Sequence, residues 1–589
     1  MRLRPSLTMA WLLCALLLVL RATEAPKYAL GWDVFGYYLY LPATFIHDDI
    51  RLQDKAWLDS LMEEYSPSST LYQLVDVDGG GRMIKYSMGM AVVFAPFFLL
   101  AHVLAEPLGF PADGLSAPYH YLITFGCMLY ILAGIFIFRR LLLHFFNEKW
   151  TAIVLALIVL GTNYLHLAVW DGTLLTHSVL FTLYALLLLA TIEWHHKPDL
   201  RSAMMIGLSG GMIALIRPPE AIVMLVPLLW AAHSSRKWRD LIEHPFHSVI
   251  VVIAFCMVLL PQGLYWKMMT GDWITNSYAN NAGEGFDLWS PHLGNYLFSF
   301  RKGWFVYTPL MLLAIFGLPW LWRRQRALFW PLVIYLPLQL WIVSSWTTWW
   351  YAGGSFSARS MVPAYVLLAV PLGGLLQQAC QHRPSRVLFS TLSIVFILLN
   401  LFQTWQWRAR IMSKDRMTRD YYFATFGRTS VPAGAEELLL VDRSIAEEGG
   451  SFDPDRYQVG RTIFESDRSV EVILSAESPF LPGPELSYRD ITKKDHAWIR
   501  ATAMLWVDSS TTAPPLIVMA FHHEGKNYGY RTTTWELAPG AQGWIPLTMD
   551  HLTPEVRTTE DIFKAYIWNM HGGTHRIKEF RVQVFEPER

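Results

Sequence analysis

The first 407 residues of this chain contain a series of apolar runs, most of them about as long as a membrane-spanning helix. A helix needs roughly 20 apolar residues to cross the hydrocarbon core of a bilayer. The runs that reach or approach that length lie at 7–22, 119–138, 151–169, 178–194, 203–216, 219–233, 248–266, 304–322, 328–346, 361–378 and 387–407. The sequence therefore predicts a mainly α-helical, polytopic membrane protein with about 11 transmembrane helices.

One further apolar run, 88–104, decides the topology of everything that follows it. Lys and Arg collect in the cytoplasmic loops of membrane proteins. If 88–104 lies on the outer surface without crossing, 15 Lys and Arg residues fall in short inner loops and five in short outer loops. If it crosses, most of the basic clusters move outside. We therefore expect an interfacial helix at 88–104, in a multi-pass protein of a bacterial inner membrane.

The distribution of charge separates a second part of the chain. Residues 410–589 hold 47 of the 96 charged residues, a density typical of soluble domains. Segments of alternating polarity, such as 496–509 and 575–587, predict the short strands of an antiparallel β-sandwich. The expected parts are a transmembrane domain, a juxtamembrane helix with a linker, and a periplasmic, all-β, jelly-roll-like sandwich, at 1–408, 409–440 and 441–589.

Several classes of function are excluded or weakened by composition. The net charge is zero and no basic stripe is present, so nucleic-acid binding through a basic face is excluded. The middles of the spans hold essentially no ionisable residues, which weakens a transporter with a proton relay or an ion path. Acidic, basic and aromatic residues concentrate instead in the outer segments, of which 23–118 is the longest. The sequence therefore favours a site at the outer membrane surface.

Several outer segments carry a resemblance to a known family. An Asp follows the first span within a long outer loop, and IKYSMGMAVVFAPF, ALIRPPEAIVML, LFSFRKGWFVYTP and WWYAGGSFSARSMVPAY come after it in order. With these segments, residues 8–405 resemble the polytopic, lipid-sugar-dependent glycosyltransferases of the C-type superfold (GT-C). That group includes the protein O-mannosyltransferases and the aminoarabinose transferase of lipid A.

The resemblance implies an enzyme of the cell envelope. It would transfer a hexosyl or pentosyl group, with inversion at the sugar carbon, from a polyprenyl phosphate-linked donor to a glycan, lipid or protein acceptor on the extracytoplasmic side. Membrane lipid would surround it. Such a reaction needs a carboxylate that activates the acceptor hydroxyl, cations that hold the leaving phosphate, and a groove for the lipid tail.

Two aspartates are the candidate catalytic residues. Asp33 lies soon after the first span in an aromatic setting, and the resemblance implies that it is the base or a carboxylate next to a metal. Asp171 matches the second acidic position of the family. Each has a structural alternative as the cap of a helix. Together they could bind Mg²⁺ or Mn²⁺ through oxygen ligands, although no spacing in the sequence demands a metal.

Three cations are the candidate phosphate ligands, namely Lys85, Arg217 and Arg359. Arg217 precedes Pro218-Pro219, which predicts a broken or re-entrant helix pair, and a guanidinium at such a break suits bidentate phosphate contact. The alternative for each cation is a long side chain reaching the interface; Arg301 and Lys302 are interpreted in that way. The candidate substrate-binding residues are Tyr37, Tyr38, His177, Trp349 and Trp350.

Several alternatives stay open at this stage. His177 also fits a hydrogen-bonded interfacial residue, and the tryptophans fit an interfacial aromatic belt. The segment 76–81 predicts a β-turn with flanking strands rather than a calcium loop. The ending KAYIWN…IKEFRVQVF is similar to jelly-roll carbohydrate-binding modules. The competing function is a non-catalytic flippase for lipid-linked sugars or an envelope-glycan-binding membrane scaffold, and an oligosaccharide ligase would differ only in donor size.

Overall fold

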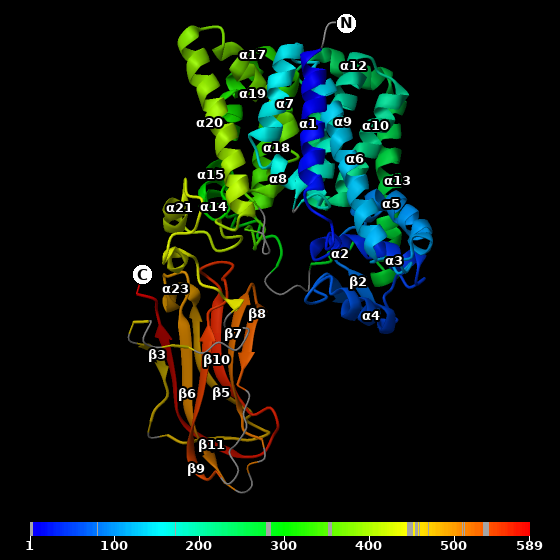
Figure 1. The fold of residues 1–589 in the computed structure, drawn as a ribbon. Helices are drawn as coiled ribbons and strands as arrows, with labels where there is room; N and C mark the ends of the chain where they lie inside the picture. Colours follow the sequence, from blue (N-terminus) through cyan, green and yellow to red (C-terminus); the bar gives the residue numbers. More distant parts are fainter. Residues whose placement is uncertain are drawn as a thin grey trace. The chain divides into compact units, whose positions relative to one another are not determined.

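The computed structural model describes most of the chain, in two units. The described residues are 4–78, 80–170, 172–278, 284–350, 356–444, 452–453, 457–458, 460–468, 470–508, 511, 513–533 and 541–588. The first unit comprises Met1–Asn280 and Phe286–Ala435, and the second comprises Glu436–Arg589 with Asn281–Gly285. The first is built mainly of helices and the second mainly of strands (Figure 1).

The helices of the first unit divide into long apolar ones and short ones. Their bounds are α1 Pro5–Ala22, α2 Asp33–Tyr38, α3 Tyr40–Phe45, α4 Lys55–Tyr65, α5 Gly89–Ala105, α6 Ala117–Leu142, α7 Glu148–Leu160, α8 Tyr164–Val169, α9 Thr176–His196, α10 Leu200–Ile216, α11 Leu225–Leu229, α12 Ser235–Glu243, α13 Pro245–Thr270, α14 Leu293–Phe298, α15 Trp304–Tyr307, α16 Leu310–Phe316, α17 Leu318–Arg324, α18 Arg326–Ser344, α19 Tyr365–Ala379, α20 Arg383–Arg408 and α21 Arg419–Thr425. The 3-10 helices are η1 Glu106–Leu108, η2 Pro218–Met224 and η3 Arg359–Met361, with η4 Ala435–Leu438 at the boundary between the units.

In the described part of the chain, 7 helical segments are long and apolar enough to cross a membrane. These are α1, α5 with η1, α6, α9, α13, α18 and α20. By the length and composition of these helices the chain is a membrane protein, as the apolar runs predicted. The larger number of spans stays a prediction.

The remaining predicted spans form shorter or broken helices. The run 151–169 divides into α7 and α8, and the run 304–322 divides into α15, α16 and α17. Pro309 caps the start of α16, and a proline lies in the first turn of α17. Because proline has no N–H and clashes with the preceding turn, it starts a new helix there instead of continuing the old one.

The run 88–104 forms the helix α5, which η1 extends to Leu108. This segment is long enough to cross a membrane, although the distribution of Lys and Arg predicts an interfacial helix. Helix α5 packs against α6, and its own residues include almost no charge. The interfacial position therefore stays a prediction that length alone does not decide.

The long segment between α1 and α6 holds the short helices α2, α3 and α4, a small hairpin and the longer helix α5. Strands β1 (Leu74–Asp76) and β2 (Arg82–Ile84) pair antiparallel, with Leu74 opposite Ile84 and Asp76 opposite Arg82. This confirms the turn with flanking strands predicted at 76–81. The hairpin is important for the site because Tyr72 precedes β1 and Tyr86 follows β2.

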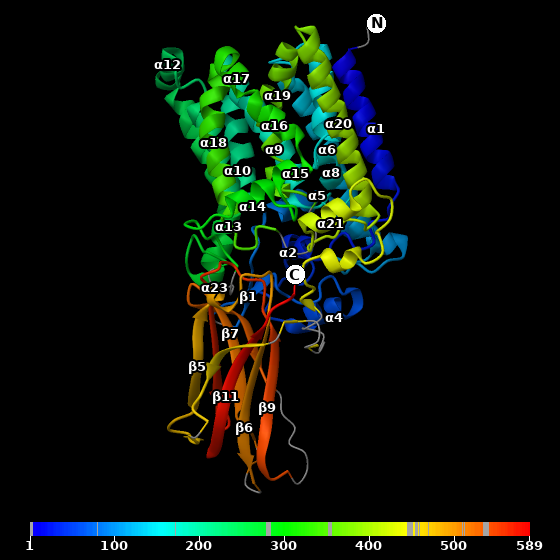
Figure 2. The ribbon, with the colours of Figure 1, turned by 90° about the vertical axis from the view of Figure 1, so that its left-hand side faces the viewer.

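The second unit consists of two antiparallel sheets. Their strands are β3 Arg461–Glu465, β4 Val472–Leu474, β5 Phe480–Ser487, β6 Trp498–Val507, β7 Leu516–His523, β8 Lys526–Thr532, β9 Gly543–Leu552, β10 Ile562–Trp568 and β11 His575–Phe585, with the short helix α23 Tyr488–Ile491 after β5. One sheet has the order β5-β10-β7-β8, and the other has the order β3-β11-β6-β9 with β4 beside β11. The strands of both run in similar directions (Figure 1; Figure 2).

Alternation of buried and exposed residues explains why these segments form strands. In β6 almost every second side chain is buried, because successive side chains of a strand point to opposite faces of the sheet. The inward residues of both sheets, such as Ile499, Phe521 and Val582, belong to one hydrophobic core. The all-β character of this part agrees with the sequence prediction.

The segment that follows α20 is less helical than predicted. An amphipathic helix was expected soon after residue 409, but α20 ends at Arg408 and the next helix, α21, has 7 residues. Arg410 has a φ of 57°, a backbone conformation that does not continue an α-helix. Thr418 then caps α21, because its side chain accepts a hydrogen bond from the backbone N–H of Tyr421.

Candidate functional site

Asp33 is the first residue of α2, and the residue before it fixes its position. Trp32 has a φ of 55°, which turns the chain sharply into the helix. Its N–H donates to the carbonyl of Pro67 at 2.8 Å, and its own carbonyl accepts a hydrogen bond from Nε2 of Gln73 at 3.0 Å. The start of α2 is thereby attached to the segment that leads into the β1–β2 hairpin.

The carboxylate of Asp33 does not serve as the helix cap that was the structural alternative for it. Trp32 is the N-cap residue of α2. The Oδ1 atom of Asp33 accepts hydrogen bonds from the hydroxyl of Tyr72 at 2.8 Å and from the hydroxyl of Tyr86 at 3.0 Å. The two ends of one hairpin thus deliver two donors to a single carboxylate oxygen.

The other oxygen of Asp33 faces a cation that is distant in the sequence, Arg359. Nη2 of Arg359 lies 3.6 Å from Oδ2, and the two side chains are 15% and 30% exposed. Arg359 begins η3, more than 300 residues after Asp33 in the sequence. Two residues that the sequence singled out in separate segments are therefore brought together, as a candidate base and a candidate phosphate ligand.

Arg217 and His177 form a second contact of predicted residues. Helix α10 ends at Ile216 and η2 begins at Pro218, so the helix breaks where Arg217-Pro218-Pro219 predicted. Nη1 of Arg217 lies 3.5 Å from Nδ1 of His177, which stands in the first turn of α9 and is buried. This contact agrees with the hydrogen-bonded alternative for His177.

Tyr37 lies within electrostatic reach of both contacts. Burial, and after it the charge of Asp33, raises the pKa of Tyr37 to about 12, while the charges of Arg217 and Arg359 act in the opposite direction. The Tyr37 ring packs against Tyr86, with ring centroids 4.7 Å apart. The charges of one carboxylate and two guanidinium groups therefore act on a phenol that stays protonated at neutral pH.

The two tyrosines that contact Asp33 stay protonated for the same reasons. Burial, followed by the charge of Asp33, raises the pKa of Tyr72 and of Tyr86 above the usual range for a phenol. Both hydroxyls are therefore hydrogen-bond donors across the pH range in which proteins are folded. Sequence reasoning missed both residues, although Tyr86 directly follows the candidate Lys85.

Three further predicted site residues are Tyr38, Asp171 and Lys85. The hydroxyl of Tyr38 donates to the carbonyl of Gly114, and its ring packs on Phe98 in the core. Asp171 lies outside the described residues, so the paired carboxylates stay a prediction. Lys85 directly precedes Tyr86. Its backbone N–H donates to the carbonyl of Gln73, and its carbonyl accepts a hydrogen bond from the hydroxyl of Ser277.

Trp349 and Trp350 do not form an open platform for a sugar ring. Both are about 6% exposed. The guanidinium of Arg301 covers the ring of Trp350, with its Cζ atom 4.4 Å from the ring centroid. Stacking of a sugar on Trp350 would first have to displace this cation. The role of the two residues in substrate binding stays a prediction.

Arg301 and Lys302 hold the segment that follows α20. Nε of Arg301 donates to the carbonyl of Asp415 at 2.6 Å. Nζ of Lys302 donates to the carbonyl of Lys414 and lies 4.8 Å from the centroid of the Trp407 ring. Burial lowers the pKa of Lys302 from 10.5 to about 7. Lys302 is buried, at 2% exposure, and does not reach the interface as the sequence suggested; both cations instead hold backbone carbonyls of the segment 414–415.

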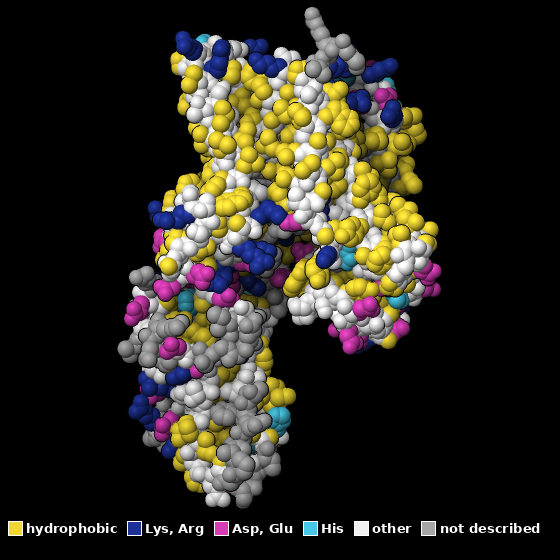
Figure 3. Space-filling view, viewed as in Figure 1, with side chains coloured by type: hydrophobic (Ala, Val, Ile, Leu, Met, Phe, Trp, Pro, Cys, Tyr) yellow, Lys and Arg dark blue, Asp and Glu magenta, His cyan; other side chains and the backbone are white. Residues whose placement is uncertain are grey.

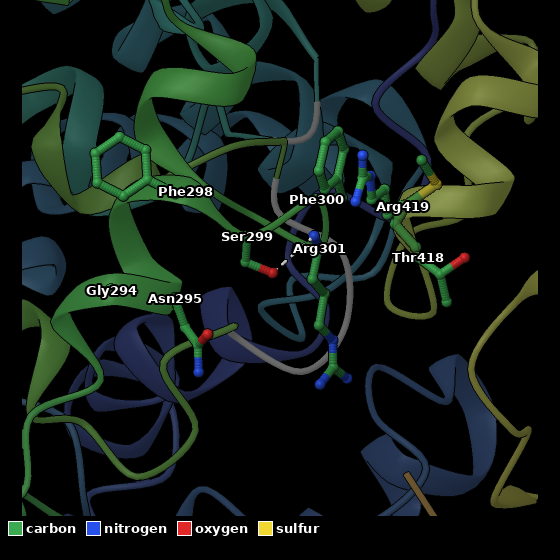
Figure 4. A pocket seen from close by; sticks show the side chains of 9 residues that line it. Gly294, Asn295, Phe298, Ser299, Phe300, Arg301, Thr418 and Arg419 are labelled. Atoms are coloured by element: carbon green, nitrogen blue, oxygen red, sulfur yellow. Dashed lines mark hydrogen bonds between the residues drawn. The ribbon is translucent and has the colours of Figure 1, made fainter. Parts of the chain in front are cut away.

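A cleft lies next to Arg301. It has a volume of about 340 Å³ and is lined by Gly294, Asn295, Phe298, Ser299, Phe300, Arg301, Met417, Thr418 and Arg419. Figure 4 shows that the side chains of Arg301 and Arg419 point away from each other. The cleft therefore offers no converging pair of cations for a phosphate, in contrast to the surroundings of Tyr37.

A buried carboxylate, Glu220, lies just beyond Arg217. It is 2% exposed and accepts hydrogen bonds from the hydroxyl of Tyr184 at 2.5 Å and from Nε2 of Gln339 at 3.1 Å. The Tyr184 hydroxyl also lies 3.2 Å from that of Tyr335. Because a buried polar group is costly unless it is hydrogen-bonded, this network ties η2 to α9 and α18 and so fixes the break at Arg217.

The described residues around Asp33 do not fit a divalent cation. Oδ1 faces two hydroxyl donors, and Oδ2 faces the cation of Arg359, whereas Mg²⁺ and Mn²⁺ require several unoccupied oxygen ligands. Within the described residues, no group of three or more His, Cys, Asp and Glu side chains is arranged to hold a metal ion. No step of the mechanism below uses a metal.

The second unit contains a buried network of hydrogen bonds around Asp561. Asp561 accepts hydrogen bonds from Tyr528 at 2.6 Å and from the N–H of Arg557 at 2.8 Å, and it lies 2.7 Å from Nδ1 of His523. Burial alone would raise the pKa of Asp561, but these hydrogen bonds outweigh it and the pKa is lowered. The network stabilises the start of β10.

Comparisons with known proteins add no family to this description. No model of a known protein family matches the chain, and no curated protein sequence matches it. The functional interpretation therefore depends on the geometry of the site and on the residues of the outer segments.

Proposed function

We propose that this protein is a membrane glycosyltransferase of the C-type superfold. It transfers a sugar from a polyprenyl phosphate-linked donor to a glycan, lipid or protein acceptor on the extracytoplasmic side of a bacterial inner membrane. The observation that carries the proposal is the contact between Asp33 and Arg359. It combines a candidate base and a candidate phosphate ligand at one point, with Arg217 and His177 nearby.

The chemistry needs one bond to form and one to break. The hydroxyl oxygen of the acceptor attacks the anomeric carbon of the sugar, and the bond between that carbon and the phosphate oxygen breaks. The polyprenyl phosphate leaves with the bonding electron pair. The proton of the hydroxyl passes to the carboxylate of Asp33, and Arg359 and Arg217 stabilise the negative charge of the leaving phosphate. A single displacement of this kind inverts the configuration of the sugar carbon.

The placement of charge along the helices supports the proposed orientation. Arginines end α6 and α17, at Arg139–Arg140 and Arg323–Arg324. Figure 3 shows apolar side chains over the sides of the helices and Lys and Arg gathered at the end that carries the N-terminus. The helix α2 and the β1–β2 hairpin lie at the opposite end of the same unit (Figure 1). Because basic residues favour the cytoplasmic side, the site would face outwards.

The proposal also covers the number of membrane spans and the architecture of the second unit. The membrane domain would have about 11 spans, including the broken helices, as the apolar runs indicate. The second unit would be a jelly-roll-like sandwich outside the membrane. Its two sheets, each with four strands in the main order, and their shared core support that architecture. Binding of an envelope glycan is the role we propose for it.

The proposal is tested by replacing Asp33 in the living cell. A strain that carries Asp33→Asn should lack the same sugar in its envelope glycans, lipids or glycoproteins as a strain without the gene. Mass spectrometry of these fractions measures the loss. The matched control is Asp54→Asn, which changes the same charge in the same outer segment. Asp54 is the N-cap of α4 and Asn caps equally well, so this control should keep the sugar.

Two results would contradict the proposal. If the Asp33→Asn strain retained the sugar at the wild-type level, Asp33 would not be the base. If the strain without the gene accumulated the lipid-linked sugar on the cytoplasmic face of the membrane, the protein would be a flippase.

A further inference from the structure

We propose that Tyr72 and Tyr86 are positioning residues that keep Asp33 paired with Arg359 through one oxygen only, so that the donor phosphate displaces Asp33 and frees it as the base. The donor would then bind before the acceptor hydroxyl is activated. This inference rests on the proposed function, and it concerns residues that touch Asp33 rather than the substrate.

The two carboxylate oxygens of Asp33 have different partners. Oδ1 accepts two hydrogen bonds, at 2.8 and 3.0 Å, both within the normal range for hydroxyl donors. Oδ2 lies 3.6 Å from Nη2 of Arg359, which is longer than a hydrogen bond between charged groups. Asp33 is therefore held firmly at Oδ1 and loosely at Oδ2.

The position of Tyr86 is fixed by two further contacts. The hydroxyl of Tyr40 donates to the backbone carbonyl of Tyr86 at 2.7 Å. The ring of Tyr86 lies so close to Gly36 that a Cβ atom there would be 2.4 Å from its Cδ2 atom. Because the ring is in contact with the backbone of α2, the hydroxyl of Tyr86 has a fixed position relative to Asp33.

The hold on Oδ1 limits how Asp33 can contact Arg359. A carboxylate that is free to rotate can take a guanidinium with both oxygens, and such bidentate pairs are the strong ones. The tyrosines prevent this by holding Oδ1. Arg359 thus keeps a weak partner that an incoming phosphate, which itself prefers a bidentate guanidinium, can replace. When that happens, Oδ2 loses its cation and becomes the acceptor for the proton of the hydroxyl.

Binding of polyprenyl monophosphate to the full chain in lipid nanodiscs tests the inference without knowledge of the sugar. Asp33→Asn removes a competitor for Arg359, so it should tighten binding, by about two- to fivefold, as for a partly exposed ion pair. In an Arg359→Gln background the same replacement should change the affinity by less than about twofold, because the pair no longer exists. An equal gain in affinity in both backgrounds would mean that Asp33 only repels the phosphate at long range. That result would overturn the proposed competition between Asp33 and the phosphate for Arg359.

The role of the tyrosines needs a second comparison. The double variant Tyr72→Phe/Tyr86→Phe should bind polyprenyl monophosphate about threefold more weakly, since Asp33 can then hold Arg359 with both oxygens. In an Asp33→Asn background the double variant should have no effect. A loss of the same size in both backgrounds would mean that the hydroxyls merely stabilise the fold, and would overturn their positioning role.

A control and a separate outcome complete the design. Tyr65→Phe removes another hydrogen bond between a tyrosine and an aspartate of the outer segment, from Tyr65 to Asp113, and should leave binding unchanged. If the wild-type protein does not bind polyprenyl monophosphate at all, the proposed function itself fails. That result differs from wild-type binding that is insensitive to Asp33 and the tyrosines, which would contradict only the present inference.

Discussion

The surroundings of Asp33 show how strongly single atoms determine the site. The carboxylate meets two phenols on one oxygen and a guanidinium on the other. The phenols come from residues that sequence reasoning did not select, whereas Asp33 and Arg359 were selected because of the segments in which they stand. Both partners of the Asp33–Arg359 contact were therefore selected from the sequence, whereas the two tyrosines that contact Asp33 were not.

The contact between Gly36 and Tyr86 gives a prediction at the scale of one residue. A Cβ at Gly36 would lie 2.4 Å from Cδ2 of Tyr86 and 2.9 Å from the Cβ of Gln73, so Gly36→Ala must push the tyrosine ring away from α2. We expect a loss of about 1–3 kcal/mol in stability from overpacking, and weaker binding of polyprenyl monophosphate. Thermal unfolding and the nanodisc binding assay measure the two effects.

The control for this replacement is another glycine. A Cβ at Gly294 would meet no heavy atom within 4 Å outside its immediate neighbours, so Gly294→Ala should keep both stability and binding. Wild-type values for Gly36→Ala would show that the tyrosine ring adjusts without cost, and that its contact with α2 does not fix its hydroxyl.

Lys302 gives a prediction about pH. Burial lowers its pKa from 10.5 to about 7 in the folded protein, so between about pH 7 and 10 the unfolded chain binds a proton that the folded protein does not. The free energy of unfolding should therefore rise with pH in this window, and this contribution is lost as the pH falls to about 7. In Lys302→Met the rise should be smaller.

Thermal unfolding in detergent at pH 7 and pH 9 measures this difference. The increase in melting temperature between the two pH values should be larger for the wild type than for Lys302→Met, by a few degrees. Lys267→Met is a suitable comparison, because Lys267 has an exposed side chain contact with the carbonyl of Gly271 and should behave as the wild type. Equal pH dependence in all three proteins would contradict the burial of a neutral Lys302.

Tyr37 and Tyr38 show why some residues of the site could not be predicted. The two are neighbours in α2, and successive residues of an α-helix point about 100° apart. Tyr37 therefore faces the charges of Asp33, Arg217 and Arg359, while Tyr38 points into the core and bonds to Gly114. Neither the composition nor the spacing of the segment distinguishes the two residues before the direction of the helix is known.

At the scale of secondary structure, the sequence predicted breaks better than lengths. The Pro-Pro pair after Arg217 ends a helix as predicted, because proline acts locally and independently of its surroundings. The division of 304–322 into three helices was missed, since an apolar run of that length also suits one continuous span. The hairpin at 74–84 was predicted from its glycines and flanking residues.

The position of that hairpin relative to α2 could not be predicted in the same way. It depends on contacts between segments far apart in the sequence, such as the hydrogen bond from Gln73 to Trp32 and the hydroxyl of Tyr265, which accepts a hydrogen bond from the N–H of Ile84 at 2.9 Å. Tyr72 has no local sequence signal because its function in the site depends on these contacts.

At the scale of the whole molecule, the separation of charge along the sequence corresponds to a change of architecture. The weakly charged part forms the helical unit, and the strongly charged part forms the two sheets. Because charged residues are rare in the helical unit, each of them was a strong candidate for the site. A charged side chain is expensive in apolar surroundings unless it has a partner or a function, and three of these charges, Asp33, Arg217 and Arg359, act on Tyr37.

The central claim is that this protein breaks the bond between a sugar and its lipid phosphate and forms a new glycosidic bond. The most direct test uses proteoliposomes that contain the purified protein, the pool of radiolabelled polyprenyl phosphate sugars extracted from the source strain, and an extract of its envelope acceptors. We expect release of free polyprenyl monophosphate and transfer of the label to an acceptor with the wild type, and neither with Asp33→Asn. Label that crosses the bilayer while still attached to its lipid would contradict the account.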